Sequence, residues 1–322
     1  MQTPSRTLAL FLLSLGACSR DRAPSPAPAP EKTAAAPPPM ADPLLTAAAL
    51  VPRIEAPPLP TATATIAAAP PPPGMLLVPG GTFTMGQDKG GQEDEHPAHT
   101  VTLSGFWLDQ TEVTYEAYQV CVDKGACKPP EKNVISKFGG LFIGPKRPVT
   151  GVSWFDSRAY CTFMGKRLPR EAEFERAVRG DDGRRFPWGS ETPTHDHTVF
   201  HTNTTDVVGS RPKGRGPYGH DDLAGNVWEW MEDDYDPIAY TREGASKGVP
   251  GNCDEIKATL QKLHREGRQG FTGSNPLPTD CEKSIRGGAY NYDADGLRST
   301  NRVHHPGNFK LLMTGMRCAK DL

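Results

Sequence analysis

The most informative stretch of the chain is Gly225-Asn226-Val227-Trp228-Glu229-Trp230, a glycine turn that runs into two tryptophans around a glutamate. Five further runs accompany it in the 322-residue chain. In chain order they are Phe106-Trp107-Leu108-Asp109, Gly151-Val152-Ser153-Trp154, Arg167-Leu168-Pro169-Arg170-Glu171-Ala172-Glu173-Phe174-Glu175, Arg286-Gly287-Gly288 and Gly315-Met316-Arg317-Cys318-Ala319. Any one run would be a weak signal, whereas six runs in a fixed order form a specific one.

Around these runs the sequence predicts a single domain from Gly74 to Leu322. Strands are expected at residues 75–78 and 83–86, joined by a Pro-Gly-Gly turn, and at residues 101–108, where a glycine at position 105 interrupts the apolar alternation. The rest of the domain is expected to consist largely of glycine-rich loops.

Three helices carry recognisable start and stop residues. They are expected at residues 114–125, 153–165 and 169–180, and each ends at a glycine. Thr114 and Ser153 are the predicted caps of the first two, and a proline opens the third. The third helix is expected to bury Phe174, Ala177 and Val178.

The cysteines predict a disulfide framework. Seven are present, and six remain once Cys18 is assigned to the N-terminal segment described below, an even number that suits an exported protein. Position favours a short loop closed by Cys121 and Cys127 and a long loop closed by Cys253 and Cys281, which leaves Cys161 for Cys318. The alternative is that one or more of these pairs stay reduced.

Taken together, the six runs resemble the formylglycine-generating enzyme family, also called sulfatase-modifying factor domains. The likeness covers nearly all of residues 75–320. It implies an α+β, C-type-lectin-like formylglycine-generating-enzyme fold with little regular secondary structure. It also implies the Cys161–Cys318 bridge.

The resemblance directs attention to a copper site. Active members of the family oxidise a substrate cysteine to formylglycine with a copper ion held by two cysteines that follow the Arg-Gly-Gly turn. The corresponding positions here are Tyr292 and Leu297, and the serine that usually follows the turn is Ala289. Thiolates suit Cu(I), whereas a phenol and an aliphatic side chain do not. The sequence therefore predicts neither a copper site nor catalytic residues of the family's kind.

The resemblance also implies a calcium site around the Gly-Asn-Val-Trp-Glu stretch. Its ligands carry over to the side chain of Asp222, the carbonyls of Gly225 and Val227, and the side chain of Glu229. Carboxylate and carbonyl oxygens are the ligands that Ca²⁺ takes in proteins. The alternative is a capped turn in which Glu229 forms an ion pair. A second family site would use Asn203, whose companion ligands are not recognisable.

Histidines offer another route to a metal. His195, His197 and His201 form an H-x-H-x3-H pattern, and His304 and His305 follow the altered turn. Imidazole suits zinc, copper or iron. The competing interpretation is a solvated polar loop, which the neighbouring Thr and Asp residues favour.

Residues 231–285 are longer than the corresponding segment of the family. Within them Asp254 is a candidate cap and Gly267 a candidate stop, and apolar residues three and four apart predict a short amphipathic helix between the two. The Cys253–Cys281 bridge would hold this lobe next to the former active-site turn. The lobe would serve either as a binding surface or as surface decoration.

The N-terminal segment predicts a lipoprotein. The apolar run Leu8–Leu15 has the length of a signal-peptide core and ends in Leu15-Gly16-Ala17-Cys18, which resembles the bacterial lipobox. We expect residues 1–17 to be removed, Cys18 to carry lipid, and residues 18–73, rich in Ala and Pro, to form a disordered tether. The alternative is an ordinary secretory peptide with a chance cysteine.

Composition and resemblance together define the expected function. The 36 Lys and Arg residues are balanced by 38 Asp and Glu residues, which argues against nucleic-acid binding. We expect a membrane-anchored, non-catalytic binding or scaffolding module of the bacterial cell envelope, on the outer membrane facing the periplasm or the cell surface. Its partner would be an envelope protein or glycan, and its cofactor calcium. The alternative is a divergent formylglycine-generating oxidase or another metal-dependent oxygenase of the family.

Overall fold

The computed structural model describes residues 70–131, 140–268 and 280–322. The chain divides into two units, Met1–Thr65 and Ile66–Leu322, and all the described residues lie in the second. The predicted signal peptide, the predicted lipid site at Cys18 and most of the predicted tether therefore lie outside the described residues. Among the helices of the described part of the chain, none combines the length and the apolar character that crossing a bilayer requires.

The described residues contain three small sheets. Their strand orders are β1–β4–β9, β2–β3 and β7–β6–β5–β8, and only the β5–β8 pair is parallel. The strands are β1 (Met75–Val78), β2 (Gly81–Met85), β3 (His99–Leu103), β4 (Phe106–Asp109), β5 (Trp228–Asp234), β6 (Lys283–Arg286), β7 (Val303–His305), β8 (Thr314–Gly315) and β9 (Ala319–Asp321).

The strands predicted at residues 75–78 and 83–86 both form, but they do not pair with each other. β1 pairs with β4, and β2 pairs with β3. The two connections between these sheets meet at Gly80 and Gly105, where a Cβ on Gly80 would lie 2.7 Å from the Gly105 nitrogen. The predicted interruption at Gly105 is confirmed, because the chain leaves one sheet and enters the other there.

The three predicted helices form, together with a fourth in the lobe at residues 231–285. Thr114 and Ser153 act as caps, since their hydroxyls accept hydrogen bonds from the N–H groups of Ala117 and Asp156, each at 3.2 Å. The helices are α1 (Tyr115–Asp123), α3 (Trp154–Phe163), α4 (Glu171–Arg179) and α5 (Cys253–Arg265).

Two of the predicted helix starts are wrong by one or two residues. α4 begins at Glu171 and not at Pro169, and Arg170 is its cap residue, whose backbone N–H donates to the Glu173 carboxylate at 2.8 Å. Asn252, not Asp254, caps α5, because the Asn252 side chain accepts a hydrogen bond from the Asp254 N–H at 3.1 Å.

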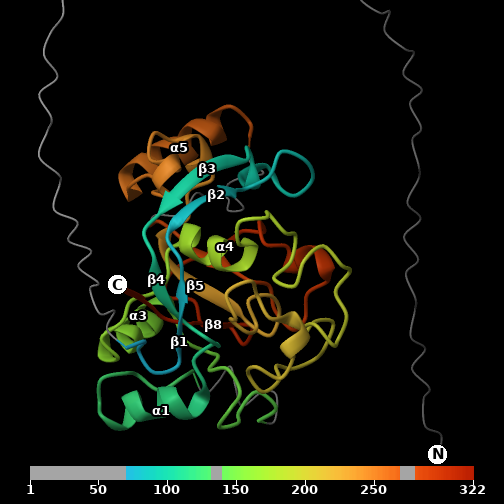
Figure 1. Ribbon diagram of the computed structural model, residues 1–322. Helices are drawn as coiled ribbons and strands as arrows, with labels where there is room; N and C mark the ends of the chain where they lie inside the picture. The colour runs from blue at the N-terminus through green and yellow to red at the C-terminus, as the bar shows by residue number, and fades with distance from the viewer. Residues whose placement is uncertain (1–69, 132–139, 269–279) are drawn as a thin grey trace, which may run out of the picture. The chain divides into compact units, whose positions relative to one another are not determined.

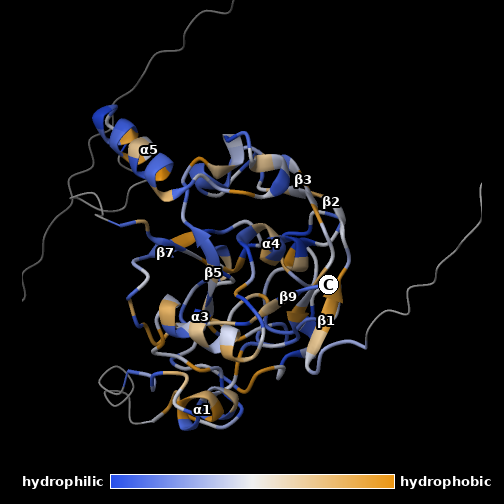
Figure 2. Ribbon diagram, turned by 90° about the vertical axis from the view of Figure 1, so that its left-hand side faces the viewer, coloured by the Kyte–Doolittle hydropathy of each residue, from blue (hydrophilic) through white to orange (hydrophobic). Residues whose placement is uncertain are grey.

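α4 occupies the middle of the domain, with α1 at one end and α5 at the other (Figures 1 and 2). All nine residues of α4 are buried, including the predicted Phe174, Ala177 and Val178, which pack with β1 and β4. α5 is mostly hydrophilic in Figure 2 and buries one side only, as predicted for an amphipathic helix. The residues on that side are Ile256, Leu260 and Leu263.

The disulfide framework is confirmed. The three bonds join Cys121 to Cys127, Cys161 to Cys318 and Cys253 to Cys281. The second ties α3 to the chain just before β9, and the third holds the start of α5 beside the start of β6.

Candidate functional site

A cavity of about 530 Å³ lies beside the four-stranded sheet. Trp228 of β5, Ile285 of β6 and residues 303–305 of β7 supply the wall on the sheet side, and residues 92–94 supply the facing turn. The other lining residues are Tyr235, Tyr292, Arg302, Leu311, Met313 and Thr314.

The two positions that hold copper in the family, Tyr292 and Leu297, have different surroundings in this chain. Tyr292 lines the cavity, and its ring meets Trp228 edge-on with centroids 5.2 Å apart. Leu297 is buried away from it, in a separate apolar cluster with Phe186 and Ala224. The described cysteines are all in disulfides, so the described part of the cavity contains no thiolate.

Two buried hydrogen-bonding groups in the cavity wall have no partner among the described residues. They are the Trp228 indole N–H and the Thr314 hydroxyl, which belong to adjacent positions of the parallel β5–β8 pair. The neighbouring Trp230 differs, because its indole N–H donates to the Val152 carbonyl at 3.2 Å. Unpaired buried hydrogen-bonding groups are rare in folded proteins, and these two belong to residues that line the cavity.

At another part of the cavity wall the side chains are firmly paired. The Tyr235 hydroxyl donates to the Asp94 carboxylate at 2.6 Å, and its ring stacks on His304 with centroids 3.9 Å apart. His304 in turn pairs with Glu282 through Nδ1. Burial, reinforced by the Asp94 charge, raises the pKa of Tyr235 well above its usual range. These contacts therefore hold this wall in place.

The predicted calcium ligands are buried and do not line the cavity. The Asp222 carboxylate accepts a hydrogen bond from the Gly209 N–H at 2.5 Å. Both oxygens of the buried Glu229 are bonded to Arg317, at 2.7 and 2.8 Å. Glu229 thus has the ion pair that the alternative interpretation requires, and the calcium ligand set stays a prediction.

The charge balance of this region nevertheless suits a divalent cation. Three buried carboxylates, on Glu112, Asp222 and Glu229, surround the single guanidinium of Arg317. Neither oxygen of Glu112 has a hydrogen-bond donor among the described residues, although its side chain is only 1 % exposed. Burial and the Asp222 charge raise the pKa of Glu112 well above its usual range. Oxygen donors of this kind suit Ca²⁺, although the three carboxylates do not bring their oxygens within 4.8 Å of one another.

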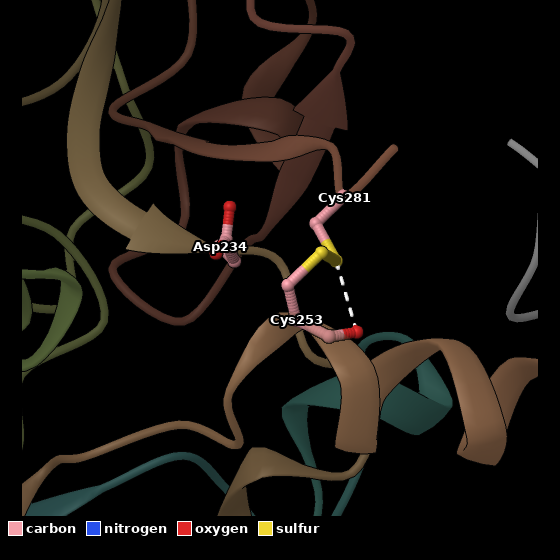
Figure 3. Close-up of side chains that lie close together, drawn as sticks. All are labelled: Asp234, Cys253 and Cys281. Carbon is pink, nitrogen blue, oxygen red and sulfur yellow. Dashed lines mark hydrogen bonds between the residues drawn. A yellow bond between two sulfur atoms is a disulfide. The ribbon is translucent and has the colours of Figure 1, made fainter. Parts of the chain in front are cut away.

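The other candidate metal residues are not brought together. His197 stacks on Trp188 with centroids 4.9 Å apart, and His195 and His201 lie against Phe200. Asn203 is exposed. Within the described ranges, the one group of three potential ligands with donor atoms within 4.8 Å of one another is Asp234, Cys253 and Cys281 (Figure 3), and its two sulfurs are bonded to each other.

Sequence reasoning missed two functional candidates, Thr314 and Glu112. A signal existed for Thr314, because it directly precedes the Gly-Met-Arg-Cys run. Nothing in the local sequence distinguishes Glu112, whose isolation follows from tertiary packing alone.

Comparison with known proteins agrees with this geometry. Residues 61–322 match the family model of the sulfatase-modifying factor enzyme 1-like domain. The chain is 31% identical over 263 residues to the serine/threonine-protein kinase Pkn1 of Chlamydia trachomatis, an alignment that covers 77% of this chain and 38% of that protein. It is 32% identical over 225 residues to the formylglycine-generating enzyme of Streptomyces coelicolor, covering 52% of this chain and 71% of that one. The chain thus spans about two fifths of the length of its chlamydial relatives.

Solved structures share the fold. PvdO from Pseudomonas aeruginosa matches with a TM-score of 0.59 at 24% identity, covering 77% of this chain and 94% of that one. Treponema denticola variable protein 1 matches with a TM-score of 0.55 at 21% identity, covering 77% and 95%. The α+β fold expected from the six sequence runs is confirmed.

Proposed function

Because the chain belongs to the family of sulfatase-modifying factor enzyme 1-like domains, we propose that it uses the family's fold as a non-catalytic binding module. The cavity beside Trp228 takes up a segment of a partner polypeptide. No formylglycine is made there.

The observation that carries this proposal is the pair of unpartnered groups in the cavity wall. The Trp228 N–H and the Thr314 hydroxyl can both donate to a peptide carbonyl, and each gains a hydrogen bond that it lacks in the free protein. The aromatic rings of Trp228, Tyr235 and Tyr292 supply apolar contact area around them. These are the features of a binding site with a few fixed polar anchors.

The same cavity is poorly suited to the family's oxidation. Cu(I) would need sulfur ligands, and Tyr292 and Leu297 provide none. Leu297 also lies in a different cluster from Tyr292, so the two positions do not form a site for any metal.

Calcium supports the module by stabilising its fold. We assign the ion to Asp222, Glu229 and the carbonyls of Gly225 and Val227, with the Glu112 carboxyl beside Asp222. The support for this assignment is the excess of buried carboxylates over the single Arg317 and the unpartnered oxygens of Glu112. When bound, the ion neutralises charge that would otherwise oppose folding, and it takes no part in chemistry.

The module is held at a membrane by lipid on Cys18. Support comes from the Leu15-Gly16-Ala17-Cys18 sequence and from the Ala- and Pro-rich residues that follow it. A two-chain lipid would anchor the protein durably, and the tether would let the domain reach partners in the bacterial cell envelope.

Recovery of the partner from solubilised membranes tests the binding proposal. Thr314→Val removes one of the two anchors at nearly constant volume and is expected to lower the amount of partner recovered with the protein at least about fivefold. Thr150→Val is the matched control, because Thr150 is equally buried and unpartnered but lies outside the cavity. Equal recovery with both variants would contradict the proposal.

A further inference from the structure

A second hollow, of about 460 Å³, adjoins the cavity beside Trp228. Gln92 lines both. The second hollow contains five cationic side chains and one carboxylate, and its other lining residues are Gly, Gln, Ser and Thr. The cations are Lys89, Arg179, Arg184, Arg185 and Arg298, and the carboxylate is Asp295.

Three of these cations are fixed by partners. Arg298 is buried and bonded through both terminal nitrogens to the carboxylate of Glu95. Arg179 is also buried and donates to the Gly86 carbonyl at 2.5 Å. Arg184 pairs with the exposed Asp182 at 2.7 Å. Arg179 also pairs with Glu175 at 3.2 Å, so the charges of all three are balanced and these side chains give the hollow a rigid lining.

The remaining two cations are available to a ligand. Lys89 is exposed and has no ion-pair partner among the described residues. Arg185 is 55% exposed and meets Asp295 at 3.1 Å, but Asp295 is itself 78% exposed. Ion pairs between exposed groups are weak in water, so an incoming anion can compete with Asp295 for Arg185.

The loop that carries Lys89 is held in place before any ligand arrives. The Gln92 N–H donates to the Glu95 carboxylate at 3.0 Å, and the His96 ring bonds to the Gly90 carbonyl at 2.7 Å. Gly91 has a φ of +69°, and a Cβ there would lie 2.7 Å from Glu95 Cδ, so glycine is required. A pre-formed loop reduces the entropy lost on binding.

The two hollows differ in charge. The cavity beside Trp228 is lined by Glu93 and Asp94 against one arginine, Arg302. The second hollow instead presents Lys89, which has no ion-pair partner among the described residues, and Arg185, whose partner is exposed. We infer that the partner segment is acidic: it places carboxylate or phosphoryl groups in the second hollow while a neighbouring residue occupies the cavity beside Trp228. This inference rests on the proposed binding function and specifies the chemistry of the partner.

Three short peptides test it by isothermal titration calorimetry at low salt. The first is acetyl-Phe-Gly followed by four glutamates, the second carries four glutamines instead, and the third carries phosphoserine in place of one of those glutamines. We expect the glutamate peptide to bind about tenfold more tightly than the glutamine peptide, and the difference to shrink in high salt. If the phosphoserine peptide binds more tightly than the glutamate peptide, the anion is phosphoryl; if not, it is carboxylate. Either result supports the inference.

Two double variants make the test specific. In Lys89→Gln/Arg185→Gln the preference for the glutamate peptide should fall to about twofold or less. The fold should persist, because both side chains are exposed. In Lys124→Gln/Lys128→Gln, which removes two exposed lysines at and beyond the end of α1, the preference should remain. A glutamate preference that survives the first double variant would overturn the inference. So would equal binding of the glutamate and glutamine peptides to the natural chain, although the cavity proposal would then stand. No binding by any of the three would contradict both.

Discussion

Most buried carboxylates among the described residues are paired with a particular arginine. Arg302 donates to both oxygens of Glu171, at 2.7 and 2.9 Å, and Arg286 bonds to the same carboxylate at 3.2 Å. Burial acts against the ionisation of Glu171, but these guanidinium groups prevail and lower its pKa to about 2. Two carboxylates, Asp233 and Glu112, lack such compensation, and each leads to a prediction.

Asp233 is expected to make stability depend on pH near neutrality. Burial, followed by the nearby Glu171 charge, raises the pKa of Asp233 from 3.8 to about 7. The folded state therefore prefers the protonated form, so the favourable contribution is complete below about pH 4 and is lost as the pH rises through about 7. In the natural chain the Glu171 N–H donates to the Asp233 carboxylate at 2.6 Å. Asp233→Asn keeps an oxygen acceptor for this N–H.

We expect Asp233→Asn to melt at a higher temperature than the natural chain at pH 8 and at a similar temperature at pH 4. Melting curves at the two pH values measure this, with the exposed Asp280→Asn as control. A melting temperature at pH 8 that is unchanged or lowered by Asp233→Asn would show that its carboxylate is not a source of instability.

Replacing Glu112 is expected to change how strongly calcium raises the melting temperature. In EDTA at pH 8, Glu112→Gln should melt a few degrees, on the order of 3 °C, above the natural chain, because burial and the Asp222 charge both oppose ionisation of the Glu112 carboxyl and the amide has no proton to lose. Added calcium should raise the melting temperature of the natural chain more than that of Glu112→Gln. The exposed Glu116→Gln on α1 should respond to calcium as the natural chain does. An identical calcium response of all three proteins would remove Glu112 from the site, and no response in any of them would remove the ion.

At the scale of elements, the disulfides should contribute unequally. Cys161–Cys318 closes a separation of 157 residues, and Cys121–Cys127 closes one of 6. Because loop-closure entropy grows with loop length, replacing the first pair by alanines should cost about 5 kcal/mol of unfolding free energy, against about 2 kcal/mol for the second. Urea unfolding of the two double variants measures this, and equal losses would show that strain or packing outweighs chain entropy.

Local chemistry made the helices predictable and long-range pairing made the sheets unpredictable. The caps at Thr114 and Ser153 are properties of a few neighbouring residues, so the sequence was sufficient for them. The neighbours of β4 in its sheet are β1 and β9, and β9 lies more than 200 residues further along the chain. No local pattern reports such a partner, which is why the sequence predicted these strands but not how they pair.

The candidate site likewise has features that the sequence predicts and features that only the folded structure reveals. Tyr292 could be placed by its distance from the Arg-Gly-Gly turn, and it lines the cavity. The separation of Leu297 from it depends on a one-turn helix, Ala294–Leu297, that buries the leucine against Phe186. The unpartnered state of Trp228 and Thr314 depends on every neighbour, so only the folded structure reveals it.

At the scale of the whole molecule, average composition conceals local charge. The small net charge of -2 argues against a nucleic-acid partner. That conclusion stays a prediction. The same chain nevertheless sets a hollow with two exposed cations, Lys89 and Arg185, beside a cavity lined by two carboxylates, and it buries Glu112, Asp222 and Glu229 elsewhere in the domain. The family fold supplies the frame for these sites, and the side chains in them decide the chemistry.

Oxygen consumption tests the central claim, binding without oxidation, most directly. The purified domain is mixed with a cysteine-containing peptide, with and without added copper, and an active formylglycine-generating enzyme serves as the positive control. We predict that the protein adds nothing to the rate seen with copper and peptide alone, because neither Tyr292 nor Leu297 supplies a thiolate. Oxygen uptake proportional to protein concentration, with an aldehyde appearing on the peptide, would contradict the account.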